Sequence, residues 1–243
     1  MKGIILAAGR GSRMGDLTDN FPKCRTFLHG KELIQWQIDA MKKAGIDEIS
    51  IVRGYLADTF KFDLTYFENE RWSQTNMVTS LVAAKEWLET GTCITSYSDI
   101  VYSADAVKRL INFPGDIVIT YDPNWSDLWK MRFTNPLTDA ETFQLDGHRV
   151  IEIGHRASFV QEIEGQYMGL VKYTSAGWTK VKEYLNTFTQ AEIDNFDITK
   201  LLQGLVEVGV VVNAVAIMDK WFEVDTESDL KIYNSKYKTS PIM

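Results

Sequence analysis

Glycines and basic residues near the N-terminus form a candidate anion-binding turn. The stretch LAAGRGSR carries Gly9, Gly11 and Arg13, and Lys23 follows ten residues after Arg13, directly behind a proline. Glycines allow backbone N–H groups to approach an anion closely, and an arginine adds a charged, forked donor. We therefore expect this turn to bind a phosphate group, with Lys23 beside it.

Two carboxylates, Asp99 and Asp225, each follow an apolar, strand-like run, in SYSDIVY and WFEVDT. A bound phosphate group is commonly accompanied by a cation that neutralises its charge, and Mg2+ prefers one or two carboxylates together with substrate oxygens. Because parallel sheets place ligands at the carboxyl ends of their strands, Asp99 and Asp225 are candidate ligands of such a cation beside the glycine turn. The alternative is that Asp99 begins a turn and Asp225 caps a helix.

Other interpretations of the glycine turn fit the residues less well. A dinucleotide-binding turn requires G-x-G-x-x-G, and Met14 occupies the position of the third glycine. A P-loop requires G-x-x-x-x-G-K-[ST], a string that the sequence does not contain. The remaining alternative is an ordinary strand-to-helix turn in which Arg10 and Arg13 are simply solvated.

The elements that must position these residues alternate between strands and helices. Such alternation is typical of βαβ units and a largely parallel sheet. Apolar runs predict strands over residues 3–8, 49–52, 92–97 and 116–121, and helical spacing predicts helices over residues 32–44, 75–88 and 104–111.

The pattern changes between residues 125 and 173, where short β-like pieces are broken by turn residues. This change predicts an antiparallel insertion over one end of the sheet. Helical patterns resume over residues 176–188 and 198–206, a strand follows over 210–217, and WFEVDTESDLKIY predicts a strand and a helix capped by Asp225 or Thr226.

The composition limits the classes of function. With 243 residues, of which 45% are hydrophobic and 24% charged, the chain is predicted to be a single globular domain, residues 1–243. Its net charge of −7 argues against nucleic-acid binding. No apolar run approaches the roughly 20 residues of a membrane span. We expect a cytoplasmic protein with no nucleic-acid or membrane partner and with Cys24 and Cys93 reduced; monomer and homodimer both stay open.

The string LAAGRGSR followed by PK resembles L-A-A-G-x-G-x-R and P-K of the nucleotidyltransferases that activate sugar phosphates and alcohol phosphates with an NTP. The resemblance implies a Rossmann-like α/β fold of the nucleotide-diphospho-sugar transferase type: a mixed, mostly parallel sheet flanked by helices, with a small antiparallel insertion. It also implies Mg2+ at Asp99 and Asp225 and catalytic roles for Lys23 and Arg13. The nucleotide-binding residues that it implies are Leu6, Ala7, Ala8, Gly9, Gly11, Ser12 and Arg13. The chain departs from the family at Cys24-Arg25, where a small and an apolar residue are usual.

A polar pair, Thr75-Asn76, opens the predicted helix over residues 75–88. With Met77 it resembles the pair that precedes the metal-binding strand in choline-phosphate-type cytidylyltransferases, which favours CTP. Ser98 joins these two residues in the predicted nucleotide site. Capping of the helix is the alternative role for the pair, and the residues alone do not separate cytosine from uracil.

Residues 122–174 are predicted to bind the acceptor. The stretches WSDLWKMRFTNPLTDAETF and EIEGQYMGL resemble the phosphoglutamine cytidylyltransferases of bacterial capsule phosphoramidate synthesis, whose relatives act on phosphocholine and aminoalkylphosphonates. An arginine can hold a phosphate, and aromatic rings can face an ammonium group. The predicted acceptor-binding residues are Trp129, Arg132, Glu164, Gln166 and Tyr167. For the tryptophans, a place in the core is the alternative.

Together these features predict transfer of CMP from CTP to a small phosphorylated or phosphonate acceptor, with release of pyrophosphate. Two other functions stay open. A sugar-phosphate nucleotidyltransferase that makes an NDP-sugar would share the first half of the chain. A non-catalytic nucleotide sensor would have lost Lys23 or a carboxylate, and the sequence retains Lys23, Asp99 and Asp225.

Overall fold

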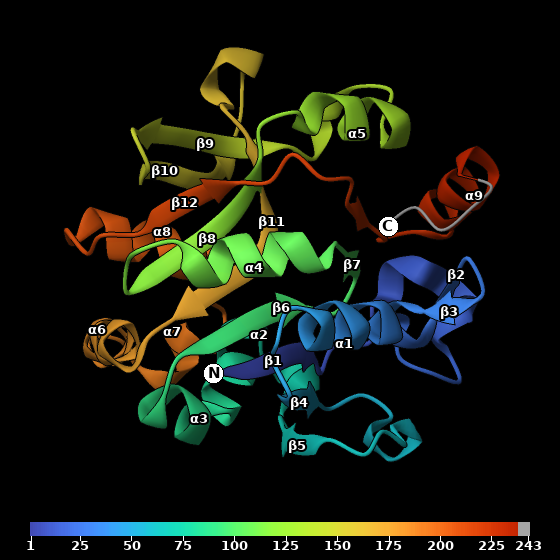
Figure 1. Cartoon of the computed structure of the whole chain (residues 1–243), viewed down its shortest axis with the longest axis horizontal. Coiled ribbons are helices and arrows are strands. Elements are labelled where there is room, and N and C mark those ends of the chain that lie inside the picture. The colour runs from blue at the N-terminus through green and yellow to red at the C-terminus, as the bar shows by residue number, and fades with distance from the viewer. Residues whose placement is uncertain (238–243) are drawn as a thin grey trace.

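A nine-stranded sheet forms the centre of the computed structural model, which describes residues 1–237 (Figure 1). The strand order is β5-β4-β1-β6-β11-β8-β12-β10-β9. Strands β5, β4, β1 and β6 run parallel to one another, as do β8 and β12, whereas β11 is antiparallel to both neighbours. The strands are β1 (Lys2–Ala7), β4 (Glu48–Arg53), β5 (Thr65–Glu68), β6 (Cys93–Tyr97), β8 (Ile117–Asp122), β9 (Glu141–Asp146), β10 (Arg149–Arg156), β11 (Gln166–Tyr173) and β12 (Asn213–Ala216).

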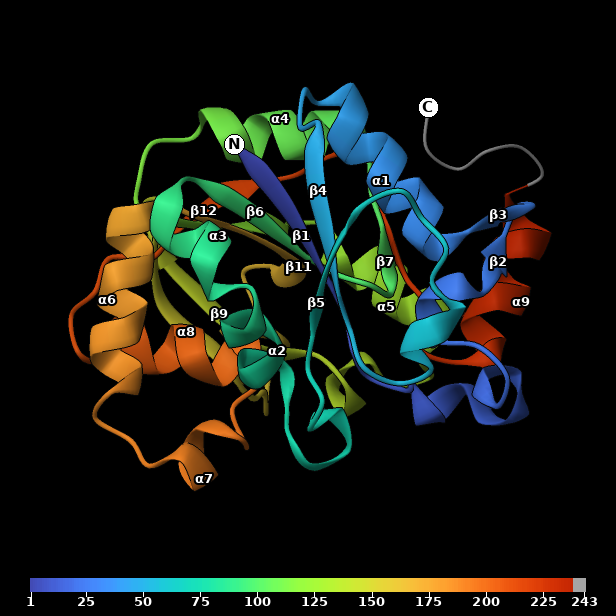
Figure 2. The same ribbon diagram turned by 90° about the horizontal axis from the view of Figure 1, so that it is seen from below.

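Helices cover both faces of the sheet, which explains why β1 is apolar on both sides, with Ile4, Ile5 and Leu6 all buried. Figure 2 shows α1 and α4 on one face and α2, α3, α6 and α8 on the other. The helices are α1 (Leu33–Lys43), α2 (Met77–Ala83), α3 (Lys85–Thr90), α4 (Ala104–Asn112), α5 (Trp125–Arg132), α6 (Ser175–Leu185), α7 (Gln190–Ile193), α8 (Ile198–Glu207) and α9 (Glu227–Lys236). The α/β fold with a mixed sheet is therefore confirmed.

The region between residues 125 and 173 differs from its prediction in two ways. It begins with helix α5, although only β-like pieces were predicted there. Its last strand, β11, lies inside the main sheet between β6 and β8 instead of covering one end. Only the β9–β10 hairpin extends the sheet at its edge as an antiparallel addition. The predicted helix over 75–88 is also two helices, because Ala84 leaves the helical conformation.

Two short ladders lie outside the main sheet. Strand β2 (Phe27–Leu28) pairs with β3 (Lys31–Glu32), and β7 (Ile100–Val101) pairs antiparallel with β13 (Phe222–Glu223). The predicted cap of the last helix is confirmed for Thr226, whose hydroxyl accepts from the backbone N–H of Asp229. Cys24 and Cys93 are free and buried, as expected of reduced thiols.

The predicted domain extends to Met243, and residues 238–243 lie outside the described part of the chain. Within residues 1–237, no helix combines the length and the apolar character that crossing a bilayer requires.

Candidate active site

The β7–β13 ladder brings Asp99 and Asp225 to one place. Asp99 precedes β7 and Asp225 follows β13, and the antiparallel pairing sets Glu223 opposite Ile100. The ladder continues by one bond, because the backbone N–H of Val224 donates to the carbonyl of Asp99 at 2.9 Å. A pairing of two residues per strand therefore joins carboxylates that lie far apart in the sequence.

The ammonium group of Lys23 lies between these two carboxylates. Its Nζ is 2.8 Å from Oδ2 of Asp99 and 2.7 Å from Oδ1 of Asp225, and only 8% of the side chain is exposed. Burial alone would lower the pKa of Lys23, but the charges of Asp99 and Asp225 outweigh it and raise that pKa. In turn Lys23 and two arginines overcome the effect of burial on Asp225 and lower its pKa. The pair is therefore charged near neutral pH.

The glycine turn gives Lys23 the room that this position needs. Gly11 has φ of 72°, which favours glycine, and a Cβ there would lie 2.5 Å from Cβ of Lys23. Lys23 is the first residue of the short 3-10 helix η2 (Lys23–Arg25), and its side chain packs against Gly11. The sequence pattern of a glycine turn followed by Pro-Lys thus has a steric basis in the chain itself.

The two arginines of the turn have different surroundings. Arg13 reaches Oδ1 of Asp225 at 2.8 Å while 63% of its side chain is exposed. Arg10 instead pairs with Asp19 at 2.6 Å on the surface. Arg13 therefore belongs to the candidate site with Lys23, and Arg10 does not.

Arg132 was predicted to hold the acceptor, but the structure places its guanidinium inside the protein. Its side chain has no exposed surface and is paired with three carboxylates: Nη1 with Glu223 at 2.5 Å, Nη2 with Oδ2 of Asp225 at 2.9 Å, and Nε with Asp229 at 3.2 Å. Negative charges at Glu223, Asp229 and Asp225 outweigh burial and raise the pKa of Arg132. In this arrangement each of its nitrogens has a carboxylate partner, and no part of the side chain is exposed to a ligand.

The predicted magnesium ligands suit a cation. Lys23 supplies a positive charge between Asp99 and Asp225, and Oδ1 of Asp99 is buried with no hydrogen-bond partner among residues 1–237. No group of three or more His, Cys, Asp or Glu side chains in that part of the chain is arranged to hold a metal ion. Two carboxylates would suit Mg2+, which commonly takes one or two carboxylates from the protein and its other ligands from water and substrate oxygens.

The other predicted nucleotide residues come from three segments of the chain: the end of β1 with the glycine turn after it, the start of α2 and the residue before Asp99. Leu6, Ala7 and Ala8 are buried, whereas Ser12 is exposed. Asn76 caps α2 by accepting from the N–H of Met77, and the hydroxyl of Thr75 accepts from Asn69 and donates to the carbonyl of Arg71. The capping role considered for this pair is therefore present at Asn76. Ser98 is partly exposed beside Asp99, and nucleotide binding by these residues stays a prediction.

The remaining predicted acceptor residues divide into two groups. Trp129 is 4% exposed and donates to Asp139, and Gln166 is 5% exposed and exchanges hydrogen bonds with the backbone of Glu141. Glu164 is exposed, and the ring of Tyr167 lies 5.6 Å from that of Tyr97 in an edge-to-face arrangement. The core alternative considered for the tryptophans matches the burial of Trp125 and Trp129.

Sequence reasoning missed two acidic residues. Asp229 completes a capping box with Thr226 and also accepts from the backbone N–H of Asp225; the string T-E-S-D carried that signal. Burial, together with the charges of Asp197 and Asp139, raises the pKa of Glu141 to about 7. Among residues 1–237 its carboxylate has no cation as a partner, and no local pattern in the sequence marks it.

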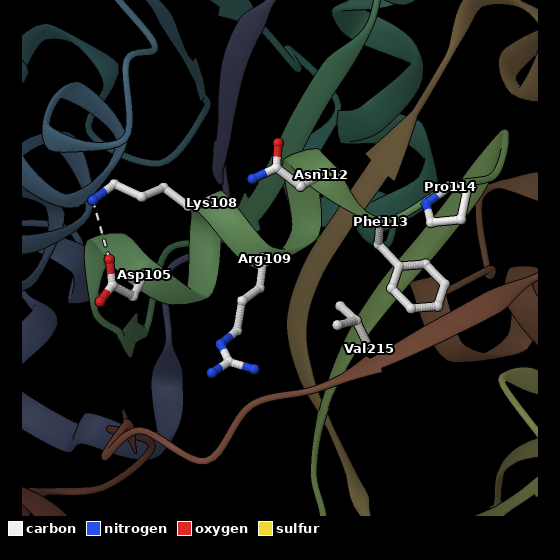
Figure 3. A pocket seen from close by; sticks show the side chains of 7 residues that line it. All are labelled: Asp105, Lys108, Arg109, Asn112, Phe113, Pro114 and Val215. Atoms are coloured by element: carbon white, nitrogen blue, oxygen red, sulfur yellow. Dashed lines mark hydrogen bonds and ion pairs between the residues drawn. The ribbon is translucent and has the colours of Figure 1, made fainter.

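A hollow of about 390 Å3 lies elsewhere on the surface, along α4 and the residues that follow it (Figure 3). None of the predicted site residues lines it. Its lining residues are Asp105, Lys108, Arg109, Asn112, Phe113, Pro114 and Val215.

The chain is similar in sequence to known proteins. Residues 3–152 match the family described as MobA-like NTP transferase domain. The chain is 38% identical to a CTP:phosphoglutamine cytidylyltransferase from Campylobacter jejuni over 97% of this chain and 100% of that protein. A choline-phosphate cytidylyltransferase from Streptococcus pneumoniae is 39% identical over 36% of this chain and 41% of that protein.

The fold has solved counterparts as well. The structure of the inositol-1-phosphate CTP transferase from T. maritima superposes with a TM-score of 0.77 at 21% identity, over 96% of this chain and 93% of that one. The family match, the end-to-end similarity and the fold lead to one conclusion: the chain belongs to the MobA-like NTP transferase family and is an enzyme of its cytidylyltransferase group.

Proposed function

We propose that this enzyme transfers CMP from CTP to a small phosphorylated acceptor of the phosphoglutamine type and releases pyrophosphate. The observation that carries the choice of acceptor is the 38% identity to a CTP:phosphoglutamine cytidylyltransferase, which extends over 97% of this chain and all of that protein. We also propose that the reaction takes place in the cytoplasm and serves the phosphoramidate modification of a bacterial capsule.

In this reaction an oxygen of the acceptor's phosphate attacks the α-phosphorus of CTP. A new P–O bond forms, and the bond from the α-phosphorus to the oxygen that bridges it to the β-phosphate breaks, so that pyrophosphate leaves. A phosphate group carries about −1.5 to −2 charges at neutral pH, so its oxygen needs no general base. The protein's task is to position the two substrates and to compensate their charge.

The contacts of Lys23 and Arg13 support their roles in that task. Lys23 is buried and charged, and Arg13 is the more exposed of the two. We assign to Lys23 the stabilisation of the α-phosphate of CTP and of the acceptor's phosphate during transfer. We assign to Arg13, with the backbone of Gly9 to Gly11, the binding of the triphosphate. Mg2+ would be held by Asp99 and Asp225 and would neutralise negative charge on the triphosphate.

The acceptor's non-phosphate end would lie near the carboxyl end of β6. Tyr97 ends that strand two residues before Asp99, and its ring packs against Tyr167. The hydroxyl of Tyr167 is buried with no hydrogen-bond partner in the described part of the chain, so a polar group of the acceptor could satisfy it. Tyr167 and Glu164 therefore remain our candidates for recognition of the acceptor.

Pyrophosphate release measured over a panel of nucleotides and acceptors tests the proposal. CTP with phosphoglutamine should give the highest kcat/KM, above CTP with phosphocholine or 2-aminoethylphosphonate and above UTP with any of them. Efficient turnover of glucose 1-phosphate would instead support the formation of an NDP-sugar. The absence of pyrophosphate release with every pair would favour a nucleotide sensor.

A further inference from the structure

We infer that Arg132 is a positioning residue that fixes the carboxylate of Asp225 so that only Oδ1 faces the substrates. The inference rests on the proposed function in one respect, namely that Asp225 is a ligand of Mg2+. It replaces the direct contact with the acceptor that the sequence predicted for Arg132.

The two oxygens of Asp225 have separate partners. Oδ1 accepts from Lys23 at 2.7 Å and lies 2.8 Å from Nη2 of Arg13, on the side of Asp99. Oδ2 accepts from Nη2 of Arg132 at 2.9 Å. A carboxylate with a positively charged partner at each oxygen cannot rotate without losing at least one of these two contacts. Arg132 therefore determines which oxygen is presented.

Arg132 is itself held firmly. Its guanidinium is planar and offers donors in a fixed geometry, and here each of its three nitrogens has its own carboxylate. The rings of Trp129 and Phe133 lie 5.4 and 5.0 Å from its Cζ. A lysine at this position would keep the positive charge but not the three fixed directions.

Asp229 holds the same aspartate from the backbone. Its Oδ2 accepts from the N–H groups of Asp225 and Thr226 at 2.9 and 2.8 Å, while its Oδ1 accepts from Nε of Arg132. Asp225 is thus fixed at its backbone by α9 and at its side chain by α5. Groups that orient a metal's ligands commonly change metal affinity by about 10–100-fold when they are removed.

The test measures binding without turnover. The Kd of CTP is determined by calorimetry with Mg2+ and with EDTA, and the ratio of the two values reports the contribution of the metal. In Arg132→Lys we expect this ratio to fall about 10–100-fold. We also expect a lower kcat, while the KM for phosphoglutamine at saturating Mg2+ changes less than about twofold.

A second variant and a control complete the design. Asp229→Asn keeps Arg132 but weakens its anchor, and the ratio should fall by a smaller factor; this variant decides the question if Arg132→Lys does not fold. The control is Lys180→Met, which removes the ion pair between Lys180 and Asp116, the residue before β8. It should lower Tm and leave the ratio unchanged.

Three results would overturn the inference. An unchanged ratio with a raised KM for phosphoglutamine would return Arg132 to the acceptor site, and an unchanged ratio and kcat with a lower Tm would make its role purely structural. A wild-type enzyme that turns over phosphoglutamine but gains no CTP affinity from Mg2+ would refute the inference and leave the proposed reaction standing. If instead no acceptor is turned over, the proposed function fails, and the CTP-binding ratio alone still decides the role of Arg132.

Discussion

The two sides of Asp225 differ in how much they can change. On the open side, Lys23 and Arg13 share Oδ1, and Arg13 and Asp99 are partly exposed. On the buried side, Arg132 donates to Oδ2 of Asp225 and also pairs with Glu223 and Asp229. The side chain of Arg132 has no exposed surface. One aspartate therefore belongs to two ion clusters, one of them partly exposed and the other buried.

This difference shows how a charged site can be both ordered and available. Buried charges need partners, because an unpaired charge in the interior is costly. Arg132 meets that need permanently for Asp225. Lys23 and Arg13 meet it on the other oxygen, where Arg13 and Asp99 are partly exposed. The buried side therefore holds Asp225 in place, and the more open side is where the proposed chemistry would occur.

The largest effects are expected from the aspartates. Asp99→Asn and Asp225→Asn should each lower kcat at least about a hundredfold at saturating Mg2+, because each removes part of the charge that compensates the phosphates. Asp225→Asn should in addition lower Tm more than Asp99→Asn, since only Asp225 also serves the buried side. Pyrophosphate release and thermal unfolding measure the two effects, with the exposed Asp63→Asn as control. Near-normal kcat in either variant would refute the metal assignment.

Lys23→Ala should affect kcat far more than the KM for CTP. Its charge is most useful where negative charge accumulates in the transition state, while the glycine turn and Arg13 bind the ground state. A loss of roughly 100-fold to 1000-fold in kcat is the range for a single stabilising donor. The surface variant Lys108→Ala serves as the control. A normal kcat with only a raised KM would make Lys23 a simple binding residue.

Glu141 provides a carboxylate outside both clusters, with no cation partner in the described chain, and it should show the smallest effect. Its pKa of about 7 in the folded protein lies above the ordinary value of 4.5 because of burial and nearby acidic charge. The folded state therefore binds this proton more tightly, and the resulting stability is present below pH 4.5 and is lost as the pH rises through 7.

Urea unfolding of the wild type and Glu141→Gln, compared between pH 4.5 and 8, measures this effect. The variant lacks the titrating group, so its stability relative to the wild type should increase across that range. A constant difference would mean that the carboxylate of Glu141 has an ionic partner in solution.

The sequence predicted the fold where patterns are local. The apolar run from Gly3 to Ala8 and the alternation that follows it correspond to β1 and its neighbours. Helix α5 was missed even though Trp125, Leu128 and Trp129 have helical spacing, because the turn residues after it suggested β structure. The place of β11 in the sheet depends on pairing between distant strands, which no local pattern encodes.

For the candidate site, the sequence indicated Lys23, Asp99 and Asp225, and the structure brings all three together. It could not indicate that Arg132 is buried. An arginine on a short helix is usually solvated, and its burial here depends on carboxylates 91 to 97 residues further along the chain.

The β7–β13 ladder also sets the order in which the protein can mature during synthesis. Strands β1, β4, β5 and β6, four of the nine, are complete by residue 97, so this part of the sheet can assemble while the ribosome is still adding residues. Asp225 lies 202 residues after Lys23 and joins it only when β13 has emerged. A nascent chain that ends before residue 225 therefore lacks one of the two carboxylates between which the ammonium group of Lys23 lies.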